Sequence, residues 1–212
     1  MEEEFVTPEG FWKLYAGKLN AKELNNDKKK ETIEAYRKAY RNDSKWTEII
    51  IAIVTEMIGS EMKLKTQNEY FRTDVTGYTT EWEEEKKIAQ QRKKYEGIKM
   101  HPLHNWKLKV AYEHENSDGW SDELCKLCHI TADLKVISSY YGSNKDDIEK
   151  TLKYYIERLD SEGTMRRAEG QWLFVFGPRK NSGDLFKAFT LDDDMNVIPL
   201  EAIKMPFLSS NS

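Results

Sequence analysis

The run WKLKVAYEHE, residues 106–115, constrains the fold of this chain more than any other segment. Apolar and polar side chains alternate along it, which is the pattern of a β-strand with one face in a core. Leu108, Val110 and Tyr112 are expected to share the apolar face, and Glu113 falls on the opposite one. The strand ends in acidic residues, which are uncommon inside strands, so this end predicts more than a solvated surface.

The remaining segments predict an α/β fold with a mixed central β-sheet flanked by helices. Periodicity and turn signals indicate helices over residues 46–58, 121–128 and 145–159, and strands over residues 69–79, 134–141, 171–177 and 185–191. Helices and strands thus alternate in an order that a mixed sheet accommodates. Residues 1–45 are expected to be an N-terminal helical extension, residues 46–205 the α/β domain, and residues 81–95 a charged excursion between two strands.

Composition is compatible with a globular protein and decides little about function. Of the 212 residues, 39% are hydrophobic and 12% aromatic, which is enough for a real core. The formal net charge of −4 does not advertise nucleic-acid binding. The net charge does not exclude nucleic-acid binding either, because the positive charges of a basic track and the negative charges of an acidic site would cancel in the net charge.

The location expected for this chain is cytoplasmic. The first residues, MEEEFVTPEGFW, are acidic and lack the features of a secretory signal. The longest apolar run, residues 49–54, is too short to span a bilayer, so no membrane partner is predicted. Cys125 and Cys128 should then be reduced thiols.

Three acidic residues form the candidate site. Asp74 lies within the strand 69–79, and Glu113 and Glu115 are two residues apart, so their side chains should share a face. If the two strands are neighbours, Asp74 converges on the same point. Three such carboxylates repel one another unless a cation compensates them, and Mg²⁺ (or Mn²⁺) suits carboxylate and water oxygens. Asp74, Glu113 and Glu115 are therefore the predicted metal ligands.

The segment from Tyr70 to Tyr141, with the helix at 46–58, resembles the core of the restriction-endonuclease-like, or PD-(D/E)xK, nucleases. That family has an acid on one strand, acid-x-Lys on the next, then a helix and a third core strand. Thr73-Asp74 matches the first half and Glu113-His114-Glu115 the second. The resemblance implies an αββαβ core and Mg²⁺-dependent hydrolysis of phosphodiester bonds, with DNA the expected partner and a homodimer possible.

Two positions depart from the family pattern. Thr73 replaces the proline, which is a common relaxation. Glu115 replaces the lysine that usually orients or activates the attacking water, although some relatives carry acid-x-Glu. Lys126, on the following helix, is the candidate substitute and a predicted catalytic residue with the three acids. Lys109 is a weaker candidate, and Glu48 or Glu56 of the leading helix is a further candidate ligand.

Other motifs leave two alternatives open. Cys125-Lys126-Leu127-Cys128-His129 spells a c-type haem attachment pattern, but haem attachment needs export and is not expected. His101 and His104 precede this pair, so a zinc-stapled interaction domain is one alternative. A catalytically inactive relative that binds or assembles is the other. His114 should face the opposite side from its neighbouring glutamates.

Contact with phosphates is expected from basic residues near the C-terminal strands. They are Arg166, Arg167, Arg179 and Lys180. A second basic cluster, Lys86, Lys87, Arg92, Lys93 and Lys94, is interspersed with glutamates, so it is as well explained by ion pairs along a helix.

Overall fold

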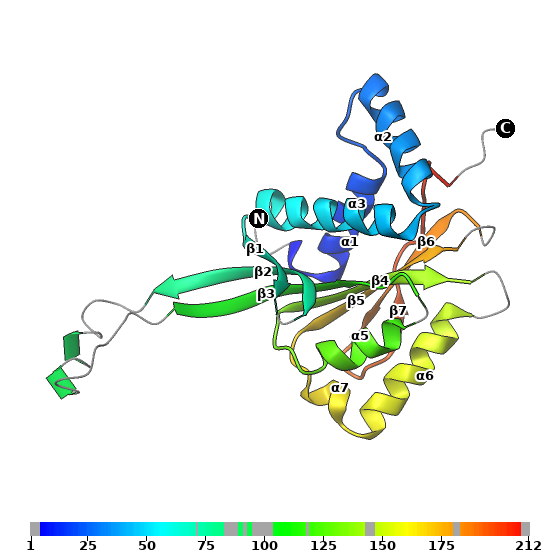
Figure 1. The fold of residues 1–212 in the computed structure, drawn as a ribbon. Coiled ribbons are helices and arrows are strands. Elements are labelled where there is room, and N and C mark those ends of the chain that lie inside the picture. The colour runs from blue at the N-terminus through cyan, green and yellow to red at the C-terminus, as the bar shows by residue number, and fades with distance from the viewer. Residues whose placement is uncertain are drawn as a thin grey trace.

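The computed structural model describes residues 5–70, 72–82, 89–90, 93–94, 104–117, 119–142, 147–179 and 183–208. These residues form a mixed β-sheet with helices on both faces (Figure 1). The helices are α1 (Pro8–Leu19), α2 (Asn26–Ala39), α3 (Asp43–Glu56), the π-helical turn η2 (Met57–Glu61), α5 (Trp120–Leu127), α6 (Ile148–Ser161) and α7 (Thr164–Arg167). The strands are β1 (Lys65–Tyr70), β2 (Thr73–Trp82), β3 (His104–His114), β4 (Leu134–Tyr141), β5 (Gln171–Pro178), β6 (Leu185–Leu191), β7 (Val197–Pro199) and β8 (Ile203–Lys204).

The strands lie in the sheet in the order in which they occur in the chain. Strands β1, β2 and β3 are antiparallel neighbours, whereas β3, β4 and β5 are parallel neighbours. Strands β6 and β7 continue the sheet in the antiparallel sense, and β8 pairs with β6. The two parallel connections run through α5 and through α6 with α7, which cover one face of the sheet (Figure 1). The predicted α/β class with a mixed, helix-flanked sheet is confirmed.

The opposite face of the sheet packs against the N-terminal helices. Phe11 and Tyr15 of α1 are buried in the same hydrophobic core as Trp46 of α3 and Tyr112 of β3. The rings of Phe11 and Tyr112 stack with centroids 6.3 Å apart. Residues 1–45 are helical, as expected, but α1 is part of this core, so the boundary drawn at residue 45 does not separate two cores.

A bulge in β3 corrects the predicted pattern of its faces. Gly77 of β2 pairs with Val110, and the next residue, Tyr78, pairs with Leu108, so Lys109 is the extra residue. Val110 packs with the α1–α3 core, whereas Leu108 packs with the α5–α7 core. The expectation that Leu108 shares a face with Val110 is therefore wrong. On the N-terminal side of the bulge, the even-numbered residues of β3 point to the α5–α7 side of the sheet, whereas Val110 and Tyr112 beyond it point to the α1–α3 side.

The segment between α3 and β2 also differs from the prediction. Gly59 was expected to end the helix, but η2 continues it to Glu61, and β1 then pairs with β2 as a hairpin. A Cβ atom added at Gly77 of β2 would lie 2.5 Å from Cγ2 of Ile58. The close approach of this turn to β2 therefore requires glycine at position 77.

No helix among the described residues is long and apolar enough to cross a membrane.

Candidate active site

The antiparallel pairing of β2 and β3 brings Asp74 and Glu113 together. Val75 pairs with Tyr112, so Asp74 lies one step further along the ladder, opposite Glu113. Residues opposite each other in an antiparallel pair point to the same face, with Cβ atoms about 5 Å apart. The two strands are neighbours, as the sequence required. We refer to Asp74 and Glu113 as the acid pair.

Asp74 is fixed by the backbone of the neighbouring strand. Its Oδ2 accepts a hydrogen bond from the backbone N–H of His114 at 2.7 Å. Burial raises the pKa of Asp74 and the charge of Glu69 raises it further, while the His114 hydrogen bond opposes them. Two residues of the β1–β2 turn region, Glu69 and Arg72, have left-handed backbones with φ of 57° and 61°. Such strain in residues other than glycine is typical of functional sites.

Glu113 is the more deeply buried member of the pair, at 2% exposure. Its Oε1 lies 2.6 Å from Nζ of Lys126. Burial raises the pKa of Glu113 to about 8, and Asp74 and Glu123 raise it while Lys126 lowers it. Burial, with the nearby acids adding to it, therefore makes the carboxyl proton of Glu113 hard to remove without a compensating cation.

Lys126, the substitute lysine predicted from the sequence, reaches this point from α5. Its Nζ contacts Glu113, forms an ion pair with Glu123 one helical turn away, and donates to the backbone oxygen of Arg72 at 2.9 Å. Although burial lowers it, the pKa of Lys126 is raised on balance by the two glutamates. Glu123 was not among the predicted site residues. The Glu-x-x-Lys spacing on the helix after β3 is the sequence signal that would have revealed it.

Glu115 does not join the acid pair in this arrangement. Its Oε1 accepts a hydrogen bond from the backbone N–H of Ser117 at 2.6 Å, and its own N–H donates to Ser138. It is not among the charges that shift the pKa of Asp74 or Glu113. Its predicted role as a metal ligand stays a prediction, and the structure brings Glu123 to the acid pair instead.

His114 points to the other side of the strand, as the alternation predicted. Its Nδ1 lies 3.2 Å from Oγ of Ser138, and its Nε2 lies 3.4 Å from the hydroxyl of Tyr140. Burial lowers its pKa to about 4, so the ring is neutral at neutral pH. This histidine belongs to a buried polar network, and only its backbone serves the acid pair.

The weaker candidates are held elsewhere. Nζ of Lys109 lies 2.6 Å from Asp133, and Glu56 pairs with Lys18 at 3.3 Å. Glu48 is exposed on α3.

The two cysteines differ in environment. Cys125 is exposed, whereas Cys128 is buried and its Sγ lies 3.5 Å from Sδ of Met165. Burial raises the pKa of Cys128 to about 11, which favours the neutral thiol over the thiolate that zinc requires. His101 and the side chain of His104 lie outside the described residues, so the zinc alternative stays a prediction.

The arginines expected to hold phosphates have other contacts. Arg166 forms an ion pair with Asp160 at 2.9 Å, and Arg167 donates to the backbone oxygens of Gly163 and Glu162. Lys180 lies outside the described residues, as do Lys86, Lys87 and Arg92 of the other basic cluster.

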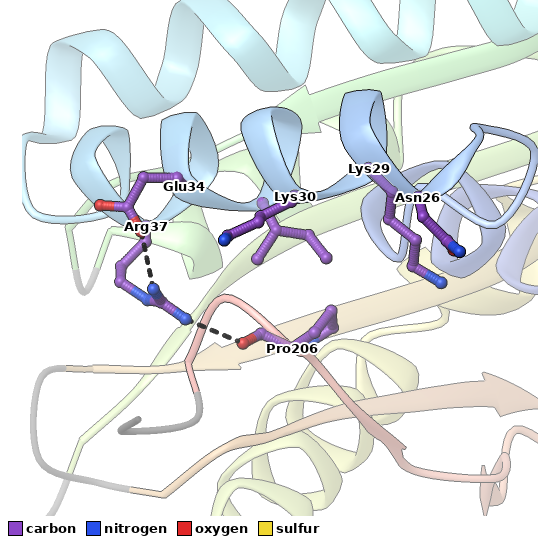
Figure 2. A pocket seen from close by; sticks show the side chains of 7 residues that line it. Asn26, Lys29, Lys30, Glu34, Arg37 and Pro206 are labelled. Carbon is purple, nitrogen blue, oxygen red and sulfur yellow. Dashed lines mark hydrogen bonds and ion pairs between the residues drawn. The ribbon is translucent and has the colours of Figure 1, made fainter. Parts of the chain in front are cut away.

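A groove of about 590 Å³ lies between α2 and the C-terminal segment, away from the acid pair (Figure 2). Lys29, Lys30 and Arg37 line it, and Arg37 is held by Glu34 and by the backbone oxygen of Pro206. Figure 2 shows these basic side chains along one side of the groove. It contains one carboxylate, that of Glu34, already paired, so it offers no catalytic acid pair.

Comparison of the chain with models of known protein families and with curated protein sequences found no match. Within the part of the chain that the structure describes, no group of three histidine, cysteine, aspartate or glutamate side chains has the geometry of a metal site. The candidate site is therefore defined by its own geometry: two opposed carboxylates, a third from α5, and one ammonium among them.

Proposed function

We propose that this protein is a metal-dependent nuclease that hydrolyses phosphodiester bonds in DNA, using Mg²⁺ or Mn²⁺. The observation that carries the proposal is the pairing of Asp74 with Glu113 across β2 and β3, with Nζ of Lys126 2.6 Å from Glu113. The family that the sequence resembles has an acid on one strand and acid-x-Lys on the next. Asp74, Glu113 and Lys126 would supply the two acids and the lysine of that motif.

The order of the elements supports the same proposal. A leading helix, α3, precedes the antiparallel strands β2 and β3, and α5 then leads to β4, which lies parallel to β3. This is the order expected of a restriction-endonuclease-like core. In this proposal Lys126 of α5 takes the role of the motif lysine, whose position in the sequence is occupied by Glu115.

The oxygen atoms around Lys126 are of the chemical kind that a divalent cation prefers. Carboxylate oxygens of Glu113 and Glu123 and the carbonyl oxygen of Arg72 already surround one positive centre, the Lys126 ammonium. Hard cations such as Mg²⁺ prefer such oxygens and bind with only one or two carboxylates plus water. Asp74 and Glu113 would hold the ion, with Glu123 beside them, and the ion when bound would polarise the phosphodiester and activate a water.

The chain's own groups have separable tasks in this proposal. The backbone N–H of His114 donates a hydrogen bond to Oδ2 of Asp74 and so keeps the Asp74 carboxylate oriented. Glu113 must give up its proton to bind a cation, and its raised pKa makes this the pH-dependent step. Lys126 supplies positive charge where the phosphate would gain negative charge. A homodimer, which the family resemblance makes possible, would bring two such sites together and is part of the proposal.

A second candidate function is that of an inactive relative that binds or assembles. One observation favours it: the Lys126 ammonium already neutralises Glu113 and Glu123, so the acids have a counter-charge without a metal. In that case Lys126 would hold the strands and α5 together, and divalent ions would not change the stability of the protein.

The test is a titration of Mg²⁺ and Mn²⁺ against supercoiled plasmid and single-stranded DNA, with Asp74→Ala and Glu113→Ala beside the wild type. We expect metal-dependent cleavage that falls by about 10³-fold or more in both variants, because each loses an oxygen ligand. Glu149→Ala, on α6 and paired only with Lys153 among the contacts that the structure gives, is the matched control.

A thermal melt in the same metal series adds a readout that does not need turnover. Binding of the ion to the folded state raises the melting temperature in proportion to its affinity, and this rise should vanish in Glu113→Ala. Wild-type protein that neither cleaves nor gains stability with either ion would support the inactive relative. Cleavage that survives in both variants would point to a contaminating nuclease. Stoichiometric zinc in the purified protein would support the zinc-stapled domain.

A further inference from the structure

A cluster of three aromatic side chains lies on the ribbon that β2 and β3 form with β1. The rings of Tyr78 and Trp106 are stacked, 4.3 Å apart and 9° from parallel. The ring of Tyr70 lies 5.2 Å from that of Trp106. Trp106 is nevertheless 36% exposed, which is unusual for a tryptophan held between other rings. We refer to Tyr70, Tyr78 and Trp106 as the aromatic cluster.

The bulge at Lys109 places Trp106 on the face of the sheet that carries Tyr78 and the acid pair. Beyond the bulge, Trp106 and Leu108 share the face of Ala111 and Glu113, and their partners on β2 include Tyr78. Without the extra residue, Trp106 would project toward α3. Figure 1 shows β2 and β3 running out past α5 and α6, which cover the neighbouring part of this face. The cluster and the acid pair therefore lie on the same face of the sheet, with the buried pair Thr76 and Ala111 between them.

The separation along this face suits a strand of nucleic acid. Tyr78 follows Asp74 by four residues on β2, which corresponds to about 13 Å. A few nucleotides of an extended strand cover such a distance. Unpaired bases stack on tyrosine and tryptophan whatever their sequence, whereas the bases of a duplex are already stacked on each other. The cluster thus selects for unpaired bases.

Positive charges flank the cluster at both ends. Lys65 is paired with Tyr78 in the β1–β2 ladder, and its Nζ donates to Oγ1 of Thr80 at 2.7 Å on this same face. Arg72 is exposed in the turn between Tyr70 and the strand that carries Asp74. Acids lie in the same region: Glu69 is close enough to raise the pKa of Asp74, and Asp133 pairs with Lys109 at the bulge. Cations beside exposed rings match a phosphate backbone with unpaired bases.

We propose that the aromatic cluster binds unpaired bases of single-stranded nucleic acid and so directs the adjoining phosphodiester to the acid pair. The proposal rests on the nuclease function as regards the acid pair, but the binding step does not depend on cleavage. It names the substrate class of the site: single strands and unpaired ends or loops, in preference to intact duplex.

The test is binding in EDTA, where no cleavage takes place. Fluorescence anisotropy is measured with a short fluorescein-labelled oligothymidylate and with a fully paired duplex, using the full chain. We expect the single strand to bind more tightly than the duplex. Trp106→Ala should weaken single-strand binding about tenfold to a hundredfold, since stacking of each base is lost. Tyr78→Ala should do the same to a smaller degree.

Matched variants separate stacking from charge and from folding. Trp106→Phe should recover most of the affinity, because a smaller ring still stacks. Lys65→Ala should reduce the dependence of affinity on salt, whereas Trp106→Ala should leave that dependence unchanged. Tyr154→Ala removes a tyrosine that is 56% exposed on α6 and should leave binding unchanged. Thermal melts of every variant check that each is folded.

Several results would overturn the proposal. One is Trp106→Ala protein that is folded and binds single strands as the wild type does; the cluster would then only stabilise the ribbon. Another is wild-type protein that binds duplex at least as tightly as single strand. A third is a wild type that binds neither nucleic acid, which would leave the cluster to a protein partner.

The same series distinguishes this inference from the proposed nuclease activity. Cluster-dependent binding in EDTA without cleavage in Mg²⁺ or Mn²⁺ would retain the inference and reject the nuclease. Metal-dependent cleavage that needs Glu113 and is unchanged by Trp106→Ala would reject the inference and retain the nuclease.

Discussion

Two lysines on the same face of the sheet have opposite environments. Lys126 of α5 has three oxygen partners, and the glutamates among them raise its pKa. Lys135 of β4 pairs in the ladder with Ala111, two residues before Glu113, and is 0% exposed. Among the described residues its Nζ has no hydrogen-bond partner and lies 4.9 Å from the ring centroid of Trp172. Burial lowers its pKa to about 8.

The difference shows where this face tolerates charge. At the ends of β2 and β3, acids and an ammonium are close enough to compensate one another, and the site keeps charges that a cation or phosphate can use. In the middle of the sheet, the ammonium of Lys135 lies over an aromatic ring and near the more distant charge of Glu169, and these offset a small part of its desolvation cost. In the first region the charges compensate one another, whereas in the second the desolvated charge reduces stability.

The largest expected effect is that of Glu113→Gln, which removes the charge of the acid pair and keeps its shape. Cleavage should fall by about 10³-fold, because the amide cannot replace a carboxylate ligand. The stability of the metal-free protein should not fall in this variant, because the glutamine no longer has a proton to lose. The folded state binds the Glu113 proton with a pKa of about 8, against the ordinary glutamate pKa of 4.5. The folded state thus holds more protons between these pH values, and wild-type stability falls as pH rises from about 4.5 to 8.

Urea denaturation in EDTA at several pH values, beside initial cleavage rates in Mg²⁺, measures both effects. The variant should lack the decline, which amounts to at most about 1.4 kcal/mol per pH unit. Full cleavage by Glu113→Gln, or an unchanged pH dependence, would show that Glu113 is not the buried acid of a catalytic site.

Lys126→Met should have the next largest effect. We expect cleavage to fall about tenfold to a hundredfold, as the positive charge beside the phosphate is lost. Stability in EDTA should fall by about 1–2 kcal/mol, less than for most broken buried pairs, because Glu113 can retain a proton. Lys126→Arg should recover stability. Faster cleavage by Lys126→Met, or cleavage at lower Mg²⁺, would instead identify the ammonium as a competitor of the ion.

Lys135→Met should change stability and leave cleavage unaltered. A methionine of similar length removes the desolvated charge, and we expect a gain of about 1–3 kcal/mol. The lysine pKa in the folded state, about 8, lies below its ordinary 10.5. Between these values the unfolded chain holds more protons, so wild-type stability rises with pH there. The variant should lack this rise.

Urea denaturation at pH values between 7 and 10 tests this difference. Lys153→Met, which alters an exposed lysine of α6 paired with Glu149, should leave the denaturation midpoint unchanged. A loss of stability in Lys135→Met would mean that the cation over Trp172 stabilises the core, and the contrast between the two lysines would disappear.

Local patterns were sufficient to predict the sheet and the central relation of the site. The alternation in residues 106–115 located β3, and the aromatic and β-branched run at 69–79 located most of β2. Because the period of a strand is two, neighbouring strands were enough to place Asp74 beside Glu113. Lys126 was predicted as the substitute lysine because it lies on the helix that follows the second acidic strand.

The features that were not predicted depend on contacts between distant segments. The bulge at Lys109 leaves no mark in the local alternation, and it moved Trp106 and Leu108 to the face of the acid pair. The β1 hairpin follows from the packing of Ile58 against Gly77, which lie nineteen positions apart in the printed sequence. Glu123 lies in the first turn of α5, where acids are common in any helix, so its position alone did not mark it as a partner of Lys126.

Glu115→Gln has the smallest expected effect and decides between the sequence pattern and the observed turn. The acid-x-acid spacing predicts a metal ligand, whereas the structure has Oε1 of Glu115 accepting from the Ser117 N–H at 2.6 Å. Glutamine keeps an oxygen for that hydrogen bond, so stability should change by less than about 0.5 kcal/mol. Cleavage should stay within about threefold of wild type, since the charge is not used at the acid pair. Glu115→Ala, which removes the acceptor, should cost about 1 kcal/mol. If Glu115→Gln instead abolishes cleavage as Glu113→Gln does, the turn must rearrange on metal binding, and Glu115 would be the ligand that the motif predicts.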